Sequence, residues 1–430
     1  MRIFRWAFLV WLHPVVVQAD DWPQWRGPER DGVWRETGIL NSFEPGDLKP
    51  VWSSPIGAGY SGPTVQGNRV YVTSRVEEPE QVEQVHCIDR LTGIEVWKFV
   101  YSCEYSNIGY PLGPRAAVLI SDGKAYALGA MGHFHCLDAN DGKLLWKKDL
   151  AADYGTSIPG WGIAASPLAD EDRVYLQVGG TDGSGMVAFD KTSGKEEWRA
   201  MESAASYSAP RFIQNGNRKQ ILAWTGDWFA TLDPETGHVA WKHPFKKAKM
   251  IINVADPVLD PESGRVFFTS FYDGSYLFTL NPEKGGLALL WERRGRSEMH
   301  TDALHSIIST PVIRGDYVYG LDSHGEFRCL RLDNGDRIWS EESIVEKARW
   351  GTAFFVQQGD LTWIFTENGE LILGRLSPEG FERISSARII EPTTFLPRRN
   401  GNILWSHPAF AYKHIFVRND RELISIDLTK

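Results

Sequence analysis

Short apolar runs rich in Val, Ile, Tyr and Phe recur along the chain, separated by turn residues. The unit 311–339 holds four such runs, with Asp316, Gly325 and Gly335 among the residues that divide them. Runs of this kind bounded by Gly and Asp predict short strands joined by tight turns. The unit is therefore predicted to fold as a four-stranded antiparallel meander.

A signature made of a small residue, Asp, Gly and Trp closes six of these units. The clearest copy runs from Cys87 through Asp89 and Gly93 to Trp97. The six tryptophans, at intervals of 49, 52, 43, 50 and 48 residues, are Trp97, Trp146, Trp198, Trp241, Trp291 and Trp339. A period in this range indicates repeated supersecondary units. The glycine supplies the positive φ of a hairpin turn, and the tryptophan is expected to pack from the outer strand against the neighbouring unit.

The number of units predicts the architecture. Eight strand starts are found, at Pro63, Ala116, Pro167, Pro210, Pro257, Pro311, Ala353 and Pro408. A single meander cannot bury both of its faces, and packing in a closed ring leaves few exposed edges. We therefore predict an all-β fold, an eight-bladed β-propeller of four-stranded antiparallel blades. The last unit has no room for a fourth strand, so the N-terminal strand 49–53, with Trp52, is expected to pair beside 424–428 and close the last blade.

The seventh unit lacks the signature tryptophan. Its first two runs, 352–356 and 361–365, persist, but residues 371–381 contain no Trp. We interpret this unit as a degenerate blade. A ring of seven blades is the alternative.

The N-terminal region divides into two segments before the propeller at 49–430. Residues 1–19 carry Arg2 and Arg5, an apolar stretch and a small residue at Ala19, which is typical of a cleaved signal peptide. Residues 20–48 contain three tryptophans and many turn residues, and we expect this extension to be strapped on the propeller. The mature chain is expected to be a periplasmic or secreted monomer.

Charge narrows the choice of partners. The sequence has 46 Lys and Arg against 55 Asp and Glu, a formal net charge of −9. An acidic surface disfavours nucleic acid and anionic membranes as partners. No transmembrane segment is expected, so an envelope protein or a small-molecule ligand remains as the partner.

The repeated signature resembles the tryptophan-docking repeat of pyrroloquinoline-quinone (PQQ) propellers. That family includes quinoprotein alcohol dehydrogenases and an outer-membrane-assembly lipoprotein. The segments 22–28 and 59–63 look like an exported bacterial branch known as PQQ-like repeat proteins. The resemblance covers residues 49–430 and implies the propeller architecture. The enzymes hold the quinone beneath two adjacent cysteines, and this chain has no adjacent pair, so PQQ with calcium is a possible cofactor without that support.

The four cysteines are separate in the sequence. Cys87, Cys136 and Cys329 fill the small-residue position of three different blades and are expected to be buried thiols, because equivalent positions in different blades lie too far apart to bridge. A Cys87–Cys103 disulfide is a second possibility.

The loops that lead into the blades predict a ligand site at one end of the propeller axis, here called the axial mouth. The candidate ligand-binding residues are Tyr60, Arg115, Trp161, Tyr207, Asn253, His305, Trp350 and Trp405. Asp256 and His407 lie close to these positions and are candidate acid or base groups. The alternative is that the aromatic side chains only fill the central channel.

Two histidine groups are further candidates for chemistry. His133 and His135 would lie on the same side of a strand and could begin a metal site, although a surface turn is the preferred interpretation. Glu298, His300 and His305 follow Trp291 in an irregular insertion and could form a metal or acid/base cluster.

Taken together, these features favour a ligand-binding or protein-binding scaffold in the cell envelope over an enzyme. One alternative is a PQQ-dependent oxidoreductase acting on alcohols or sugars, with Arg115 near the quinone carboxylates and Asp256 or His407 as base. Another is an envelope assembly factor that binds β-segments of client proteins along a blade edge.

Overall fold

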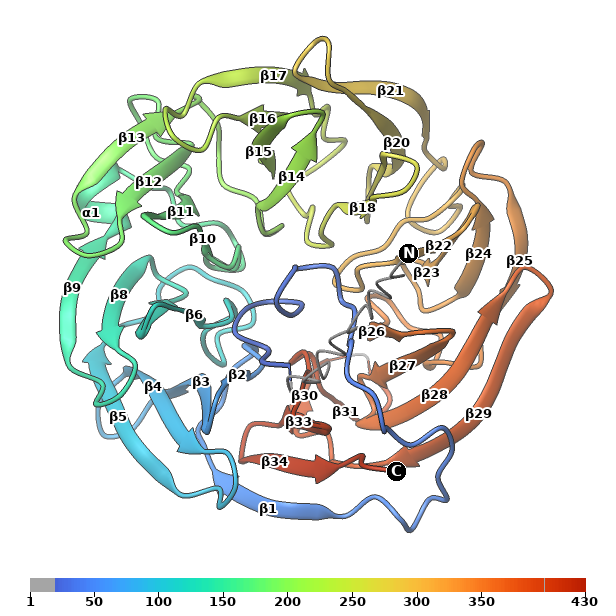
Figure 1. The fold of residues 1–430 in the computed structure, drawn as a ribbon, viewed down its shortest axis with the longest axis horizontal. Helices are drawn as coiled ribbons and strands as arrows, with labels where there is room; N and C mark the ends of the chain where they lie inside the picture. The colour runs from blue at the N-terminus through green and yellow to red at the C-terminus, as the bar shows by residue number, and fades with distance from the viewer. Residues whose placement is uncertain (1–19, 398) are drawn as a thin grey trace, which may run out of the picture.

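Eight four-stranded antiparallel sheets surround a central axis in the computed structural model, which describes residues 20–397 and 399–430 (Figure 1). The predicted all-β, eight-bladed propeller is confirmed. The predicted signal peptide, residues 1–19, lies outside the described residues. One short helix, α1 (Leu150–Tyr154), follows the second blade and is capped at its N-terminus by the Asp149 side chain.

The first four blades follow one another along the chain. Their strands are β2 (Thr64–Gln66), β3 (Arg69–Val76), β4 (Val82–Asp89) and β5 (Glu95–Ser102); β6 (Leu119–Ser121), β7 (Lys124–Leu128), β8 (His133–Asp138) and β9 (Leu144–Asp149); β10 (Leu168–Ala169), β11 (Arg173–Gln177), β12 (Met186–Asp190) and β13 (Glu196–Ala200); β14 (Arg211–Asn215), β15 (Arg218–Trp224), β16 (Trp228–Leu232) and β17 (Val239–Pro244).

The remaining blades complete the ring. Their strands are β18 (Val258–Asp260), β19 (Arg265–Ser270), β20 (Gly274–Asn281) and β21 (Gly286–Arg293); β22 (Val312–Arg314), β23 (Tyr317–Leu321), β24 (Phe327–Arg331) and β25 (Arg337–Glu341); β26 (Ala353–Gln358), β27 (Leu361–Thr366), β28 (Glu370–Ser377) and β29 (Gly380–Arg388); β32 (Ala409–Ala411), β33 (His414–Arg418), β34 (Glu422–Asp427) and β1 (Pro50–Pro55). A two-stranded ribbon, β30 (Thr394–Phe395) and β31 (Asn402–Ile403), joins blades 7 and 8.

The N-terminal strand closes the last blade, as the sequence predicts. Strand β1 pairs antiparallel with β34, and Trp52 lies opposite Ser425. Figure 1 shows β1 in blue beside β34 in red at the rim. The seventh blade is complete, with β29 as its fourth strand. The alternative of seven blades is therefore wrong.

The signature tryptophans join each blade to the next. The indole Nε1 of Trp97 donates to the carbonyl of Ala139 in the next blade at 3.1 Å, and Trp146 donates to Lys191 at the same distance. A Cβ added to Gly142 would lie 2.6 Å from the Trp97 ring, so only glycine fits beneath that ring. The predicted packing of the tryptophans against the neighbouring blade is confirmed.

Blade 5 departs from the regular register. The paired stretch between the β-bulge and the hairpin turn is longer there than in blade 1, and Leu277 lies opposite Trp291. Gly286 rather than Gly285 lies beneath Trp241 of the preceding blade. The insertion in this repeat lengthens the hairpin and moves the docking glycine by one residue.

Blade 7 has Ser385 where other blades carry the tryptophan. Ser385 pairs with Leu373 just before the β-bulge, as Trp146 pairs with Cys136. The backbone N–H of Phe43, in the N-terminal extension, donates to the Ser385 hydroxyl at 2.9 Å. The Phe43 ring is buried and stacks on Trp363, with centroids 6.0 Å apart and an interplanar angle of 4°. The extension thus occupies the docking position that blade 7 leaves open.

Residues 20–48, here called the strap, cross the centre of the propeller (Figure 1). Trp22 forms a β-bridge with Val65 of blade 1, and the Trp34 N–H donates to the carbonyl of Gln357 in blade 7 at 2.8 Å. The Asp21 side chain accepts from the N–H of Gly67 in the turn between β2 and β3. The strap therefore ties blades at the junction of the two chain ends.

All four cysteines are buried free thiols. Cys87, Cys136 and Cys329 are buried as expected, and each lies opposite the signature tryptophan of its own blade. The alternative Cys87–Cys103 disulfide is wrong.

Candidate functional site

A cavity of about 130 Å³ lies at the axial mouth, among the loops that lead into the blades. Eight of the ten side chains predicted from the sequence line it: Tyr60, Arg115, Trp161, Tyr207, Asp256, Trp350, Trp405 and His407. The repeat places one lead-in loop of each blade at this end of the axis. Equivalent positions of successive repeats, although distant in sequence, therefore line the same cavity.

The walls of the cavity are aromatic. Tyr110 makes edge-on contacts with Trp161, Trp350 and Trp405, with ring centroids 5.9, 5.5 and 5.5 Å away. Trp161 and Trp350 also meet directly, at 5.6 Å. Aromatic pairs at these separations and angles are mutually attractive through their quadrupoles. The mouth is therefore a preorganised apolar site.

The floor of the cavity combines Asp256, His407 and Trp25 of the strap. The Trp25 indole donates to the Asp256 carboxylate, and its ring meets the His407 ring edge-on at 4.5 Å. The N–H of Ala209 donates to the other Asp256 oxygen at 2.8 Å. Burial raises the pKa of Asp256, and burial lowers the pKa of His407 to about 4. His407 is therefore neutral at pH 7.

Two arginines of the strap lie behind this floor. The Arg30 guanidinium is buried and donates to the backbone carbonyls of Pro167 and Pro210, the latter at 2.8 Å. Arg26 donates to the carbonyl of Asp31 at 2.8 Å. Burial lowers the pKa of Arg30 to about 9 and that of Arg26 to about 10. The charge of Asp256 opposes this lowering, so the carboxyl group and the two guanidiniums stabilise one another.

Arg115 hydrogen-bonds to the backbone of the loop that precedes it in the chain. Its guanidinium donates to the carbonyls of Gly109 at 2.9 Å, Tyr110 at 2.6 Å and Gly113. Burial lowers the pKa of Arg115. These bonds hold the loop that carries Tyr110.

Asn253 and His305 do not line the cavity. The Asn253 amide donates to the carbonyls of Trp224 and Thr225 and is fully buried. His305 Nε2 accepts from the Gly295 N–H at 3.1 Å, and Nδ1 lies 3.0 Å from the carbonyl of Phe271. Both side chains hold backbone in place, because each faces a neighbouring loop rather than the axis.

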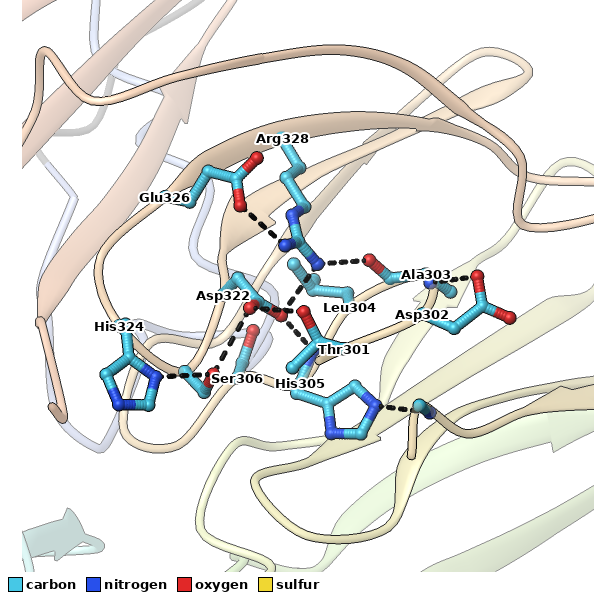
Figure 2. Close-up of polar contacts among 12 residues, drawn as sticks. Thr301, Asp302, Ala303, Leu304, His305, Ser306, Asp322, His324, Glu326 and Arg328 are labelled. Atoms are coloured by element: carbon cyan, nitrogen blue, oxygen red, sulfur yellow. Dashed lines mark hydrogen bonds and ion pairs between the residues drawn. The ribbon is translucent and has the colours of Figure 1, made fainter. Parts of the chain in front are cut away.

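Figure 2 shows the network that fixes the loop around His305. Asp322 accepts from the His305 N–H and from the Thr301 hydroxyl, each at 2.8 Å, and pairs with the buried Arg328 at 2.9 Å. Arg328 also donates to the carbonyl of Ala303. Both members of this buried charge pair make further hydrogen bonds, and the Arg328 Nε is left without a partner among the described residues.

The other candidates for chemistry lie away from the axial mouth. Glu298 contacts Lys249 and His300 contacts Ser297, so the insertion does not gather Glu298, His300 and His305 around a shared point. Within residues 20–397 and 399–430, no group of three or more His, Cys, Asp and Glu side chains is arranged to hold a metal ion.

His133 and His135 lie on strand β8, so the preferred interpretation as a surface turn is wrong. His135 is buried against Tyr101, at 4.2 Å between centroids, and burial lowers its pKa to about 4. His133 lies 3.5 Å from the Cys103 sulfur. The two imidazole rings pack against aromatic side chains of the outer strand of blade 1. This packing explains their presence without a metal site.

PQQ is a planar tricarboxylate, and a site for it needs free cationic groups and an open aromatic face. Arg115 spends its hydrogen bonds on three carbonyls, and the Tyr110 ring lies among the tryptophans on which a quinone would stack. With these side chains so arranged, the site does not fit the quinone.

Tyr110 and Trp25 were not identified from the sequence. Tyr110 lies in the long connection between blades 1 and 2, outside the repeated signature, between Gly109 and Pro111. Trp25 lies in the strap, whose path no periodic pattern specifies. The only sequence feature that could have indicated Tyr110 is an aromatic residue between Gly and Pro in a loop.

Comparisons with known proteins agree on the fold. The family model described as outer membrane protein assembly factor BamB matches residues 81–341. The BamB of Burkholderia pseudomallei is 27% identical over 223 residues, 50% of this chain and 51% of that protein. The 1-butanol dehydrogenase (quinone) of Thauera butanivorans is 27% identical over 36% of this chain and 26% of its own length.

The chain thus spans about half the length of the first of these relatives and about a quarter of the second. Among solved structures, the computationally designed Ika8 protein is 12% identical with a TM-score of 0.54, and the match covers 88% of this chain and 99% of that chain. Within the described residues, no helix is both long enough and apolar enough to cross a membrane. With its family match over more than half its length, the chain belongs to the BamB-like family of PQQ-type repeat propellers.

Proposed function

We propose that this chain is an exported scaffold of the cell envelope that binds a ligand, or a segment of a partner protein, in the axial mouth. The observation that carries the proposal is the aromatic cavity, whose walls come from several lead-in loops and whose floor is closed by the strap. Concave apolar sites with a few polar groups at fixed positions are typical of binding sites. Aromatic side chains also dominate the energetics of protein interfaces.

The envelope location rests on the relatives and on the sequence of the first 19 residues. Several relatives are named outer membrane protein assembly factor BamB. An envelope protein is accordingly the proposed class of partner, bound by a chain that acts as a monomer. Signal-peptide cleavage near Ala19 would release the mature chain beginning at Asp20.

Catalysis by a bound quinone is the second candidate, because relatives include a quinone-dependent butanol dehydrogenase. The mouth would have to rearrange to accept it, since Tyr110 and Arg115 are engaged with the chain itself. The scaffold proposal is favoured for that reason.

The test is site-specific photo-crosslinking in cells that export the full chain. A photoreactive phenylalanine analogue replaces Arg349, which is exposed on the rim beside Trp350, 4.6 Å from its ring. A matched position is Leu290, 51% exposed on the outer strand of blade 5. Binding at the mouth predicts discrete crosslinked products from position 349 and none from position 290.

Products from position 290 alone would contradict the proposal and favour a partner that pairs with a blade edge. A parallel arm incubates the purified mature chain with PQQ and calcium, followed by gel filtration. Stoichiometric retention of quinone absorbance, with dye reduction on addition of an alcohol, would overturn the scaffold proposal in favour of an oxidoreductase.

A further inference from the structure

The loop between β5 and β6 places one aromatic ring at the centre of the axial mouth. Tyr110 lies edge-on to Trp161, Trp350 and Trp405, at interplanar angles of 73°, 82° and 69°. These three tryptophans come from the loops that lead into blades 3, 7 and 8. Tyr110 therefore fills a three-sided aromatic enclosure built by distant parts of the chain.

The backbone that carries this ring is held in an uncommon conformation. Tyr110 has φ 54° and Asn107 has φ 56°, in the left-handed region that non-glycine residues seldom adopt. Arg115 binds the carbonyls of Gly109 and Tyr110, and the Gly109 N–H donates to Gly160 of the blade 3 loop at 2.7 Å. Strain of this kind persists only where surrounding contacts impose it, and it is concentrated at functional sites.

Two polar atoms near the enclosure have no partner among the described residues. They are the Nε1–H of Trp350 and the Nε2 of His407, and both side chains line the cavity. His407 is 5% exposed, and its Nδ1 lies 3.4 Å from the carbonyl of Pro408. Since that contact assigns the proton to Nδ1, Nε2 is a buried acceptor. A buried polar atom without a partner is costly, which indicates a missing hydrogen-bonding group.

The Tyr110 hydroxyl does not supply that group. Over residues 20–397 and 399–430, no hydrogen bond joins this hydroxyl to the chain, and the residue is only partly buried. The Tyr110 ring thus packs against the aromatic walls of the site. Its hydroxyl makes no hydrogen bond to Trp350 Nε1–H or His407 Nε2. A ligand that offers an aromatic ring and an O–H or N–H donor would pack against these walls and hydrogen-bond to His407 Nε2.

We propose that Tyr110 is a built-in occupant of a ring-binding site, and that the ligand of the axial mouth is a phenol or indole ring that displaces it. The ring would stack against the tryptophans and donate to His407 Nε2. It could belong to a free aromatic molecule or to a Tyr or Trp side chain of a partner segment. This inference rests on the proposed function and names the chemistry of its ligand.

The test uses the full mature chain and 4-fluorophenol as the probe, followed by ¹⁹F NMR titration. Three variants are compared with the wild type: Tyr110→Gly, which removes the ring and relieves the backbone; Tyr110→Phe, which keeps the ring; and Tyr272→Ala, which removes an aromatic residue at the rim but outside the cavity lining. Circular dichroism and thermal unfolding establish that each variant is folded.

Displacement predicts that Tyr110→Gly binds 4-fluorophenol about tenfold more tightly than the wild type, while Tyr110→Phe and Tyr272→Ala stay within twofold of it. In the Tyr110→Gly background, fluorobenzene should bind at least fivefold more weakly than 4-fluorophenol, and His407→Phe should abolish that difference. Gly-Tyr-Gly, added as a competitor, reports whether a peptide side chain is accepted as well as a free phenol.

Equal affinity in Tyr110→Gly and Tyr110→Phe would overturn the inference. So would a preference for fluorobenzene, because the unpartnered nitrogen of His407 would then play no part. If these results coincide with crosslinking from position 349, the mouth binds a partner of different chemistry and only this inference fails. If crosslinking is absent as well, the proposed function fails with it.

Discussion

The regular blades and the junction of the chain ends are held together in different ways. From blade 1 to blade 7, each neighbouring pair shares its own apolar core, and the core between blades 2 and 3 contains Phe134, Trp146 and Phe189. At the junction, blades 7, 8 and 1 share one core with Trp22, Trp34 and Phe43 of the strap. The ring is therefore held by six cores that each join two blades, and by one larger core that joins three blades and includes residues of the strap.

The reason for this difference lies in how the ring closes. Blade 8 takes its fourth strand from the N-terminus, so the chain has no hairpin turn there and no glycine to receive a tryptophan from blade 7. Blade 7 correspondingly carries Ser385 in place of the tryptophan, and Phe43 covers it. Closing the ring with the other chain end removes one docking site, and the strap replaces it.

Removal of the Phe43 ring should have the largest effect on the junction. Phe43→Ala leaves a cavity against Trp363, and a buried Phe→Ala change costs about 3–5 kcal/mol of the free energy of unfolding. Phe395→Ala is the control, because Phe395 is 72% exposed, and it should change stability by less than about 0.5 kcal/mol. Chemical denaturation measures both. Equal effects would mean that the strap contributes no packing.

The junction also contains a buried carboxyl group that should make stability depend on pH. Glu367, in the turn between β27 and β28, contacts Arg399, the Trp405 Nε1–H and the Thr352 N–H, and burial raises its pKa from 4.5 to about 7. A raised pKa means that its stabilising contribution is present below pH 4.5 and is lost as pH rises to about 7. The loss amounts to about 3 kcal/mol.

Denaturation of Glu367→Gln beside the wild type, from pH 4.5 to 7.5, measures this contribution. The advantage of the wild type over the variant should decrease by that amount as pH rises. Glu382→Gln, on the exposed part of β29, is the control for removing a carboxyl charge from the surface. A constant difference for Glu367→Gln would contradict the assignment.

In the regular blades, two contributions of glycine to stability can be measured separately: the space it leaves for the docked tryptophan, and its tolerance of a positive φ. Gly142 and Gly123 have nearly equal φ angles of 74° and 70°, but a Cβ at Gly142 would meet the Trp97 ring and a Cβ at Gly123 would meet nothing within 4 Å. Gly123→Ala should cost about 1 kcal/mol from backbone strain alone. Gly142→Ala should cost about 2 kcal/mol more, because the ring must move. Equal values would show that docking adds nothing.

The smallest effect is expected from restoring a tryptophan to blade 7. Ser385→Trp should destabilise the protein by about 1–2 kcal/mol, because Phe43 already covers the position and overpacking is costly. Arg388→Trp, exposed on the same strand, is the control and should be neutral. A gain in stability for Ser385→Trp would mean that the docking position is open and that the strap does not fill it.

The repeat predicts most of the fold because its positions have local physical causes. A glycine with positive φ at Gly93 and Gly142, and a tryptophan four residues later, specify a hairpin and its docking without knowledge of the rest of the chain. The same register brings Trp161, Trp350 and Trp405 to one end of the axis. Repeated geometry places equivalent loops together, so most of the candidate site follows from it.

The sequence by itself determined the eight blades, their strand order and the pairing of the strand 49–53 beside residues 424–428. Tertiary structure alone decided that Phe43 covers Ser385, that Trp25 and Arg30 enter the axis, that Tyr110 fills the mouth, and that Asn253 and His305 face neighbouring loops. The physical reason is that these segments have no period. Their positions follow from space, hydrogen bonds and charges that exist only after the blades have closed into a ring.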